Sequence, residues 1–303
     1  MFKRTAFTMI ELVMVIVVMG IVSSIGADII ANLYENYIKT RAINKLQAQS
    51  ELVLDQIAKR LGSRIKDSVI ARQKGSANFL NYVTLTDAND SYQILEWLGK
   101  DTDSFKGTPN PGWSGFIDLD NLATTNPTLK TTGSDLNQTD NIIKALSNNT
   151  VSLLKGDGLQ KPAIIFKGSS VFDLGDYGWN GVDGNATHKV AYTAGLNDTL
   201  EFIEANATKP TEIYEQYDLS WSAYAIVPEG NNTNDFNLTL HYNYQPWENE
   251  RYDTNATTSV LIEHASTFKF TKIGDTIRLK LCIHDNNQSG NYDFAFCKEK
   301  VVY

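Results

Sequence analysis

The stretch "KRTAFTMIELVMVIVVMGIV", residues 3 to 22, decides how this 303-residue chain is organised. Two basic residues and the acidic Glu11 stand at the head of a run that is otherwise apolar. From Leu12 to Ile30 the chain has 19 residues, interrupted only by small residues and Asp28. As a helix this segment is about 28 Å long, close to the hydrocarbon thickness of a bilayer. The sequence therefore predicts a membrane-spanning helix over 12-30.

The helical pattern continues beyond the apolar run. Apolar residues recur at mostly three- to four-residue steps among charged ones, which is typical of an amphipathic helix. These residues are Leu33, Tyr37, Leu46, Val53, Ile57, Leu61 and Ile65. The chain has no proline before Pro109 to break the helix. We therefore expect one helix over 7-72, transmembrane in 12-30 and amphipathic afterwards.

Charge is unevenly distributed along the chain, whose formal net charge is -8. Residues 31–75 carry nine Lys or Arg against four Asp or Glu, whereas residues 76–303 carry 16 against 29. An acidic body repels the phosphates through which proteins grip nucleic acids. No nucleic-acid partner is expected.

Two ordinary explanations of the N-terminal segment leave Glu11 unexplained. A secretory signal peptide has a basic start, and "SSIGA" at residues 23–27 has the small residues of a cleavage site. A plain membrane anchor needs only an apolar span. Neither requires Glu11, and a carboxylate entering the hydrocarbon costs about 2.5 to 3.5 kcal/mol on insertion scales unless it is paired. Basic residues follow the span as well as precede it, so counting them does not fix the orientation.

A known family accounts for this glutamate. "AFTMIELVMVIVVMGIV", residues 6 to 22, resembles the N-terminus of type IV pilins and type II secretion pseudopilins. The resemblance implies that residues 1-6 are a leader, that a prepilin peptidase cuts between Ala6 and Phe7, and that Phe7 is then N-methylated. It also places the family's glutamate on Glu11, where it neutralises the terminal amine of a neighbouring subunit in a filament. This agrees with the need of a buried carboxylate for a partner.

Two positions depart from the family pattern. Ala6 stands where the family nearly always has glycine before the cut, and alanine is also small. Asp28 stands where many major pilins carry a helix-kinking proline. The second departure favours a minor subunit, or one with an unbroken helix.

The resemblance also implies a location and partners. The chain is expected to cross the inner membrane once, with its N-terminus cytoplasmic and its body periplasmic, before it joins a filament or the cell surface. Its expected partners are other pilin or pseudopilin subunits, the prepilin peptidase and the inner-membrane assembly platform.

The body, residues 76-303, is predicted to be an extracytoplasmic globular domain. Its first part, 76-215, looks loop-rich, with short helices at "YQILEWLGK" (92–100) and "NIIKALSNN" (141–149) and a buried strand at "PAIIFKG" (162–168). Its second part, 217-303, contains strand-like runs with period-two alternation. They are "LSWSAYAIV", "FNLTLHYNY", "SVLIEHA", "STFKFTK", "TIRLKLCIH" and "FAFCKEKVVY". The expected fold is α+β, with a long N-terminal helix packed on a C-terminal antiparallel sheet that has long loops.

Both cysteines lie in the last two of these runs. In "TIRLKLCIH" four apolar residues alternate on one face, which leaves Cys282 on the other, and Cys297 is placed in the same way in its own strand. Turn residues separate the two strands. We therefore predict a disulfide between Cys282 and Cys297 across one hairpin, formed in an oxidising compartment.

The C-terminal strand pattern also resembles that of the J-type subunit of type II secretion and of W-type minor pilins. The resemblances together imply a structural subunit, which is not an enzyme, that assembles through its N-terminal helix into a pseudopilus or a pilus-like filament. The alternative is a membrane-anchored surface binding module, such as an adhesin or a DNA-uptake tip. The chain has no CxxC, GxSxG or phosphate-binding glycine loop that would favour catalysis.

Ten Asn-x-Ser/Thr triplets occur, and in eight of them the residue two positions before the asparagine is acidic, where chance predicts about one. This extended form resembles the acceptor of bacterial oligosaccharyltransferases, which would then be a further partner. A coincidence of acidic and Asn-rich loops is the alternative. The eight candidates are Asn89, Asn137, Asn185, Asn206, Asn231, Asn237, Asn255 and Asn287.

No cofactor is expected, apart from one candidate site for calcium. "DNNQSGNYD", residues 285–293, resembles the start of a calcium loop, with Asp285, Asn287 and Ser289 at its first, third and fifth positions. The twelfth position, Phe296, has no carboxylate, so the sequence holds only half of the motif. A glycosylated or plain hairpin turn is the alternative interpretation.

Overall fold

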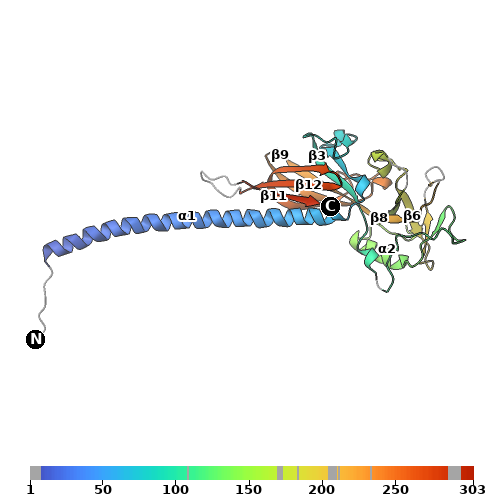
Figure 1. Ribbon diagram of the computed structural model, residues 1–303, viewed down its shortest axis with the longest axis horizontal. Coiled ribbons are helices and arrows are strands. Elements are labelled where there is room, and N and C mark those ends of the chain that lie inside the picture. Colours follow the sequence, from blue (N-terminus) through green and yellow to red (C-terminus); the bar gives the residue numbers. More distant parts are fainter. Residues whose placement is uncertain are drawn as a thin grey trace, which may run out of the picture.

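The protein consists of one long helix and a β-rich body, as a computed structural model shows (Figure 1). The structure describes residues 8–107, 109–168, 173–182, 184–203, 210, 212–232, 234–285 and 295–303. The helix α1 (Met9–Gly62) projects from the body for much of its length, and only its C-terminal part lies along the sheet (Figure 1). This confirms the expected α+β class.

Helix α1 ends ten residues before the predicted boundary at 72. Gly62 is a poor helix former, and the Ser63 hydroxyl donates a hydrogen bond of 2.9 Å to the carbonyl of Arg60. The Arg64 guanidinium donates to the carbonyl of Leu61 at 2.9 Å. The backbone N–H of Ile65 then bonds the sheet, at the carbonyl of Leu98. The last helical carbonyls are thus capped by side chains, and the chain turns into the sheet.

The main sheet has eight strands in the order β13-β12-β11-β10-β9-β3-β1-β2, and all neighbours are antiparallel. Its strands are β1 (Ile70–Gln73), β2 (Tyr82–Val83), β3 (Tyr92–Gly99), β9 (Ser222–Asn232), β10 (Asp235–Tyr244), β11 (Thr257–Ile273), β12 (Thr276–His284) and β13 (Ala295–Val302). The sheet is curled, and α1 packs on its β11–β13 part.

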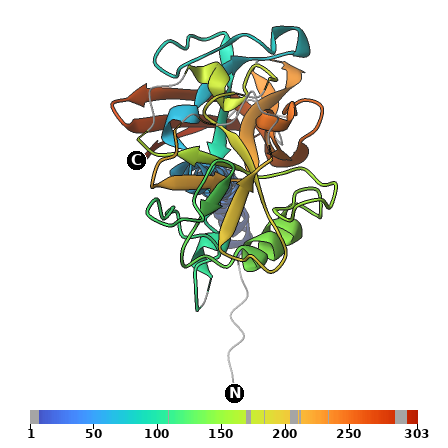
Figure 2. The same ribbon diagram turned by 90° about the vertical axis from the view of Figure 1, so that its right-hand side faces the viewer.

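A second, five-stranded sheet forms a lobe at the end of the body away from the free end of α1 (Figure 1), and this lobe faces the viewer in Figure 2. Its order is β4-β7-β6-β5-β8, from β4 (Thr128–Lys130), β5 (Ala163–Phe166), β6 (His188–Tyr192), β7 (Thr199–Phe202) and β8 (Tyr217–Ser220), and α2 (Leu136–Leu146) joins it. Short 3-10 helices are η1 (Lys66–Ser68), η2 (Ser76–Asn78), η3 (Ser104–Lys106), η4 (Leu174–Tyr177) and η5 (Pro246–Glu248). Helix α2 and the buried strand β5 confirm two predicted elements.

The boundary predicted at residue 215 does not separate the two sheets, although most of residues 76-215 lie outside helices and strands, as expected. The region expected to be loop-rich, 76-215, supplies strands to both sheets, and "YQILEWLGK" forms strand β3 instead of a helix. Strand β3 lies inside the main sheet and contributes to two cores. Leu95 and Trp97 lie in the core under α1, whereas Ile94 and Leu98 lie in the core toward the second lobe. A run buried on both faces has no period-two signal, so its pattern cannot be told from that of a short helix.

The two runs "SVLIEHA" and "STFKFTK" form one strand, β11, although a turn was predicted between them. Its register against β12 shifts between Ala265 and Thr267, and His264 has a positive φ of 59°. This is a β-bulge, which bends a strand without ending it. The bend separates two parts of the main sheet.

A buried ion pair links the main sheet to the second core. The Arg72 guanidinium bonds the Glu96 carboxylate at 2.6 Å and the carbonyl of Trp179 at 3.2 Å, and the Tyr244 hydroxyl donates to Glu96 at 2.7 Å. Every charged atom here has a partner, as burial requires. The pair therefore fixes how the segment around Trp179 sits on the sheet.

Candidate functional site

The projecting half of α1 is the candidate functional site. Every residue from Thr8 to Lys45 is exposed or only partly covered, although most of residues 9–33 are apolar. Among the described residues, α1 is the one helix long and apolar enough to cross a membrane. Exposing an apolar surface of this length to water is unfavourable, and the helix is long and apolar enough to span a membrane.

Glu11 lies in the first turn of α1, where Thr8 is the N-cap. The backbone N–H and the hydroxyl of Thr8 both donate to Oε2 of Glu11, at 2.9 and 2.8 Å, and the N–H of Glu11 donates to the Thr8 hydroxyl at 3.4 Å. This is a capping box, and it holds a negative charge at the positive end of the helix dipole.

The capping box determines which carboxylate oxygen of Glu11 is already hydrogen-bonded and which could bind a partner. The hydrogen bonds that the Glu11 carboxylate accepts from described residues all end at Oε2, so Oε1 has no hydrogen-bond partner among these residues. The predicted processing residues, Ala6 and Phe7, lie outside the described residues. Thr8 was not among the predicted site residues, although Thr-x-x-Glu before an apolar run is the signature of a capping box.

The second half of α1 is fixed to the body. Its buried stripe packs in the core beneath the sheet, and its members are Leu46, Ser50, Val53, Leu54, Ile57 and Leu61. Leu33 and Tyr37, which were predicted to share this stripe, are 63% and 61% exposed. Ile65 is buried, but beyond the helix end and in the other core. The amphipathic contact therefore begins at Leu46, about three turns later than predicted.

Polar contacts reinforce this docking. Lys298 of β13 contacts Glu51 at 2.9 Å, and Lys300 contacts Asp55. At the helix end, the Arg64 guanidinium donates to the carbonyl of the C-terminal Tyr303 at 3.2 Å and to that of Asp275 at 3.1 Å. These contacts join α1 to β13 and the end of the helix to the turn between β11 and β12.

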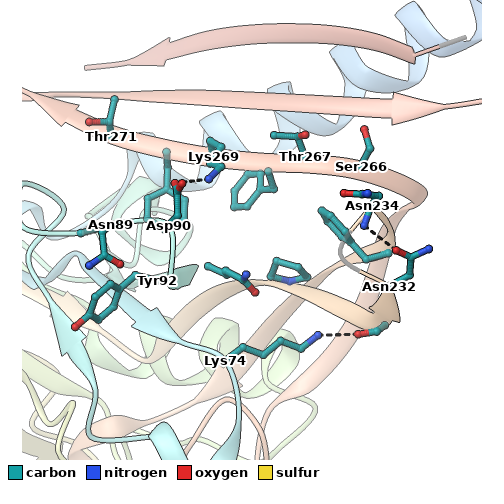
Figure 3. A pocket seen from close by; sticks show the side chains of 17 residues that line it. Lys74, Asn89, Asp90, Tyr92, Asn232, Asn234, Ser266, Thr267, Lys269 and Thr271 are labelled. Carbon is teal, nitrogen blue, oxygen red and sulfur yellow. Dashed lines mark hydrogen bonds and ion pairs between the residues drawn. The ribbon is translucent and has the colours of Figure 1, made fainter.

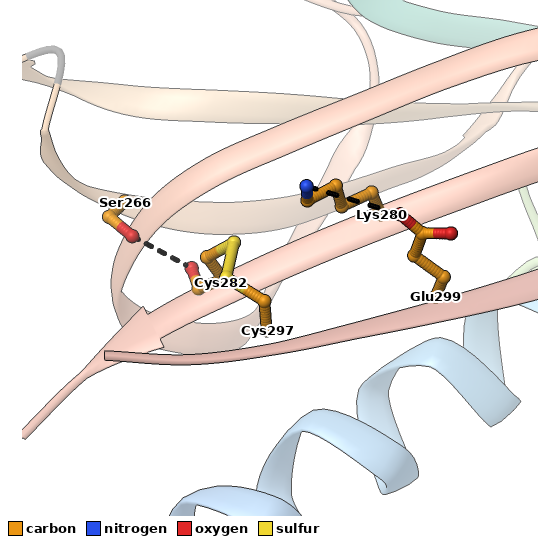
Figure 4. Close-up of a disulfide and its surroundings, with 5 residues drawn as sticks. All are labelled: Ser266, Lys280, Cys282, Cys297 and Glu299. Atoms are coloured by element: carbon orange, nitrogen blue, oxygen red, sulfur yellow. Dashed lines mark hydrogen bonds and ion pairs between the residues drawn. A yellow bond between two sulfur atoms is a disulfide. The ribbon is translucent and has the colours of Figure 1, made fainter. Parts of the chain in front are cut away.

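Cys282 and Cys297 form a disulfide, and they are directly opposed in the β12–β13 ladder with their Cα atoms 4.0 Å apart (Figure 4). The apolar residues of β12 that alternate with Cys282, such as Leu279 and Leu281, are fully buried on the opposite face. The cross-link therefore ties together two of the strands on which α1 rests.

The described glycosylation candidates are all exposed, but they fall into two groups. Asn89 and Asn255 lie in turns, and the hydroxyl residues of their triplets, Ser91 and Thr257, are exposed as well. Asn137, Asn185 and Asn237 precede hydroxyl residues that are buried, namely Thr139, Thr187 and Thr239. An enzyme that needs the whole triplet reaches the first group in the folded protein and not the second.

Some of the other predicted site residues lie outside the described residues. Asn206 and Asn287 lie outside the described residues, as does the side chain of Asn231. Of the calcium candidates, Asp285 is described and half-buried, whereas Asn287 and Ser289 lie outside. Within the described part of the chain, no three His, Cys, Asp or Glu residues are grouped as metal ligands.

Comparison of the chain with protein-family models, with curated proteins and with solved structures finds no match.

Proposed function

We propose that this protein is a minor pilin-like or pseudopilin subunit, anchored in the inner membrane by α1 and assembled into a filament through the same helix. The observation that carries the proposal is the continuous helix, whose first half is apolar on all sides and exposed while its second half is fixed to the body. Such a helix passes from lipid to a bundle of similar helices without refolding, because both environments cover its apolar surface.

Glu11 supplies the specificity of this transfer. Among the described residues, its carboxylate has contacts with Thr8 alone, and an unpaired acid in lipid costs about 2.5 to 3.5 kcal/mol. After removal of residues 1-6, the terminal amine at Phe7 of a neighbouring subunit would offer the opposite charge. Pairing with Oε1 then favours the assembled state over the free subunit in the membrane.

The test has two parts. Mass spectrometry of the N-terminal peptide, from protein extracted from its host's membranes, should show a chain that begins with N-methylated Phe7. A start near Asp28 would mean a signal peptide, and a retained Met1 a plain anchor or an unprocessed pool. In the second part, Glu11→Ala should be cleaved normally and recovered from sheared filaments at a level reduced about tenfold or more, the loss expected from removing a 1.4 kcal/mol or larger pairing.

A matched control separates the charge of Glu11 from its capping role. Gln keeps the size of the side chain and the capping geometry without the charge. If charge pairing drives assembly, Glu11→Gln should fail as severely as Glu11→Ala. Normal incorporation of Glu11→Gln would refute the pairing role and leave only the anchor.

We also propose that the exposed turn triplets at Asn89 and Asn255 are glycosylated by a bacterial oligosaccharyltransferase after folding. No glycan is expected on Asn137, Asn185 and Asn237, because the third residue of each of these triplets is a buried Thr. Glycopeptide mapping of protein from the native host tests this division. Equal occupancy of both groups would mean that modification precedes folding, and bare Asn89 and Asn255 would refute the proposal.

A further inference from the structure

The second half of strand β11 has a neighbour on one side only. Strand β11 pairs with β10 up to Ala265, opposite Phe236. Past the bulge at Ser266, residues 267–273 pair with β12 alone. The bend has turned this part of the strand away from β9 and β10, so one of its edges is open within the described structure.

The register shows which backbone groups face the open edge. Cys282 and Cys297 are directly opposed at a Cα separation of 4.0 Å, the narrow spacing of a non-hydrogen-bonded pair. The N–H and C=O of Cys282 therefore point toward Thr267 on β11. Since these directions alternate along a strand, the N–H and C=O of Phe268 and Phe270 point away from β12. Among the described residues, no backbone hydrogen bond outside the strand ladders involves either of them.

This open edge borders a groove of about 580 Å³, within the size range of ligand sites (Figure 3). Residues 266–271 of β11 form one wall, and the β9–β10 turn and the start of β3 form the other. Figure 3 shows the two walls as separate ribbons, with Lys269 of β11 contacting Asp90 of the other wall. The groove therefore runs along residues 267–271 of the open part of the strand.

The lining suits an extended peptide. Phe236, Phe268 and Phe270 give the groove an apolar floor that continues into the core under α1. At the rim, Lys269 contacts Asp90, and Lys74 donates to the carbonyl of Gly230 at 3.0 Å. With two lysines against one aspartate, the rim favours an acidic or neutral segment over a basic one.

We propose that this groove binds an extended segment of another polypeptide, which adds as a strand to the open edge of β11 at Phe268 and Phe270. The segment alternates apolar side chains, which face the aromatic floor, with polar or acidic ones, which face the rim lysines. Main-chain hydrogen bonds supply the binding, as in β-augmentation generally. The inference rests on the geometry of β11 and not on the membrane role of α1. An oligosaccharide is the competing occupant, because the rim is also rich in amides and hydroxyls.

The experiment uses the full chain in detergent micelles, produced without glycosylation because Asn89 lies on the groove wall. The probes are a panel of capped octapeptides in which valine or phenylalanine alternates with threonine, glutamate or lysine. Each peptide has a partner of identical sequence with N-methylated alternate residues, which cannot pair along its backbone. Hydrogen exchange is followed at the amides of Phe268 and Phe270. Acidic members should slow their exchange roughly three- to tenfold, the effect of one hydrogen bond, and N-methylated partners should not.

Two variants at one position provide the structural control. Phe270→Pro removes the groove-facing N–H but no donor of the ladder with β12, whereas Phe270→Ala shortens the side chain and keeps that N–H. With the Phe268 amide as the readout, the acidic peptides should still slow exchange in Phe270→Ala, at higher peptide concentrations because part of the aromatic floor is gone, and should not slow it in Phe270→Pro. The proposal is overturned if no peptide protects these amides, if N-methylated peptides protect them equally, or if chitin and mannose oligomers protect them and peptides do not.

Discussion

The two halves of α1 have the same secondary structure and opposite surroundings. Ile16 in the first half is 62% exposed, whereas Ile57 in the second is 1% exposed. The first half is apolar around its whole circumference, and the second has one apolar stripe, with charged residues such as Glu51 and Asp55 facing β13. A helix that is apolar all round is suited to lipid or to a helix bundle, and a striped helix to the surface of a protein core. The boundary between these patterns, near Leu46, is the place where the body begins.

The largest effect that tests this comparison is on stability. Ile57→Ala should reduce the free energy of unfolding of the body by about 2 to 5 kcal/mol, because it leaves a cavity in the core beneath the sheet. Ile16→Ala makes the same chemical change on the projecting half and should leave thermal unfolding of the body unchanged in detergent. Equal losses for both variants would mean that the projecting half also packs on the body.

The disulfide offers a second test. Replacing both Cys282 and Cys297 by Ala should lower the stability of the body by about 3 kcal/mol in the chain-entropy model, for cysteines separated by 15 residues. Denaturant titration with and without reductant measures the difference. The helical signal of the projecting half should persist in both cases. A midpoint that does not respond to reductant would show that the cross-link adds nothing to the ladder of β12 and β13.

Alkaline pH should lower the stability of the body, but not of the projecting half, by an amount similar to or smaller than the loss of the disulfide. Complete burial raises the pKa of Tyr217 to about 12 from its ordinary 10.0. Because the unfolded chain loses this proton first, the stabilisation is fully present below pH 10 and is lost as the pH rises toward 12, by about 3 kcal/mol. Melting at about pH 9 and 11 should show the fall, and Tyr217→Phe should reduce its slope. A midpoint independent of pH would contradict the prediction.

The smallest expected effect concerns the ion pairs that dock the helix. Lys298→Ala removes the contact with Glu51 at the partly exposed edge of the interface and should cost less than about 1 kcal/mol. The loss should shrink further in high salt. Ile57→Ala, by contrast, should be insensitive to salt. A Lys298→Ala loss as large as that of Ile57→Ala would mean that charge, and not apolar packing, holds the helix on the body.

Much of the main sheet was predictable because its outer strands are buried on one face. In β12, Ile277 and Leu279 alternate with exposed or half-buried residues. The same alternation correctly predicted that Cys282 lies on the face opposite these apolar residues. Strand β3 was missed because both of its faces are buried, and the extent of the second sheet was missed because its strands are only three to five residues long. The sequence predicts a turn where β11 bends, because Glu263, His264 and Ser266 are polar. A local pattern of this kind does not distinguish a bulge from a turn.

By itself, the sequence determined the long helix, its apolar first half, the charged Glu11 at its head and the pairing of the two cysteines. Each of these depends on residues that are near in the chain or on a period that the backbone imposes. Only the tertiary structure decided where the helix meets the body, how β3 and β1 enter the main sheet, and that β11 leaves an open edge beside a groove. These features depend on contacts between residues far apart in the chain, such as Asp90 with Lys269 and Arg64 with Tyr303, which no local pattern records.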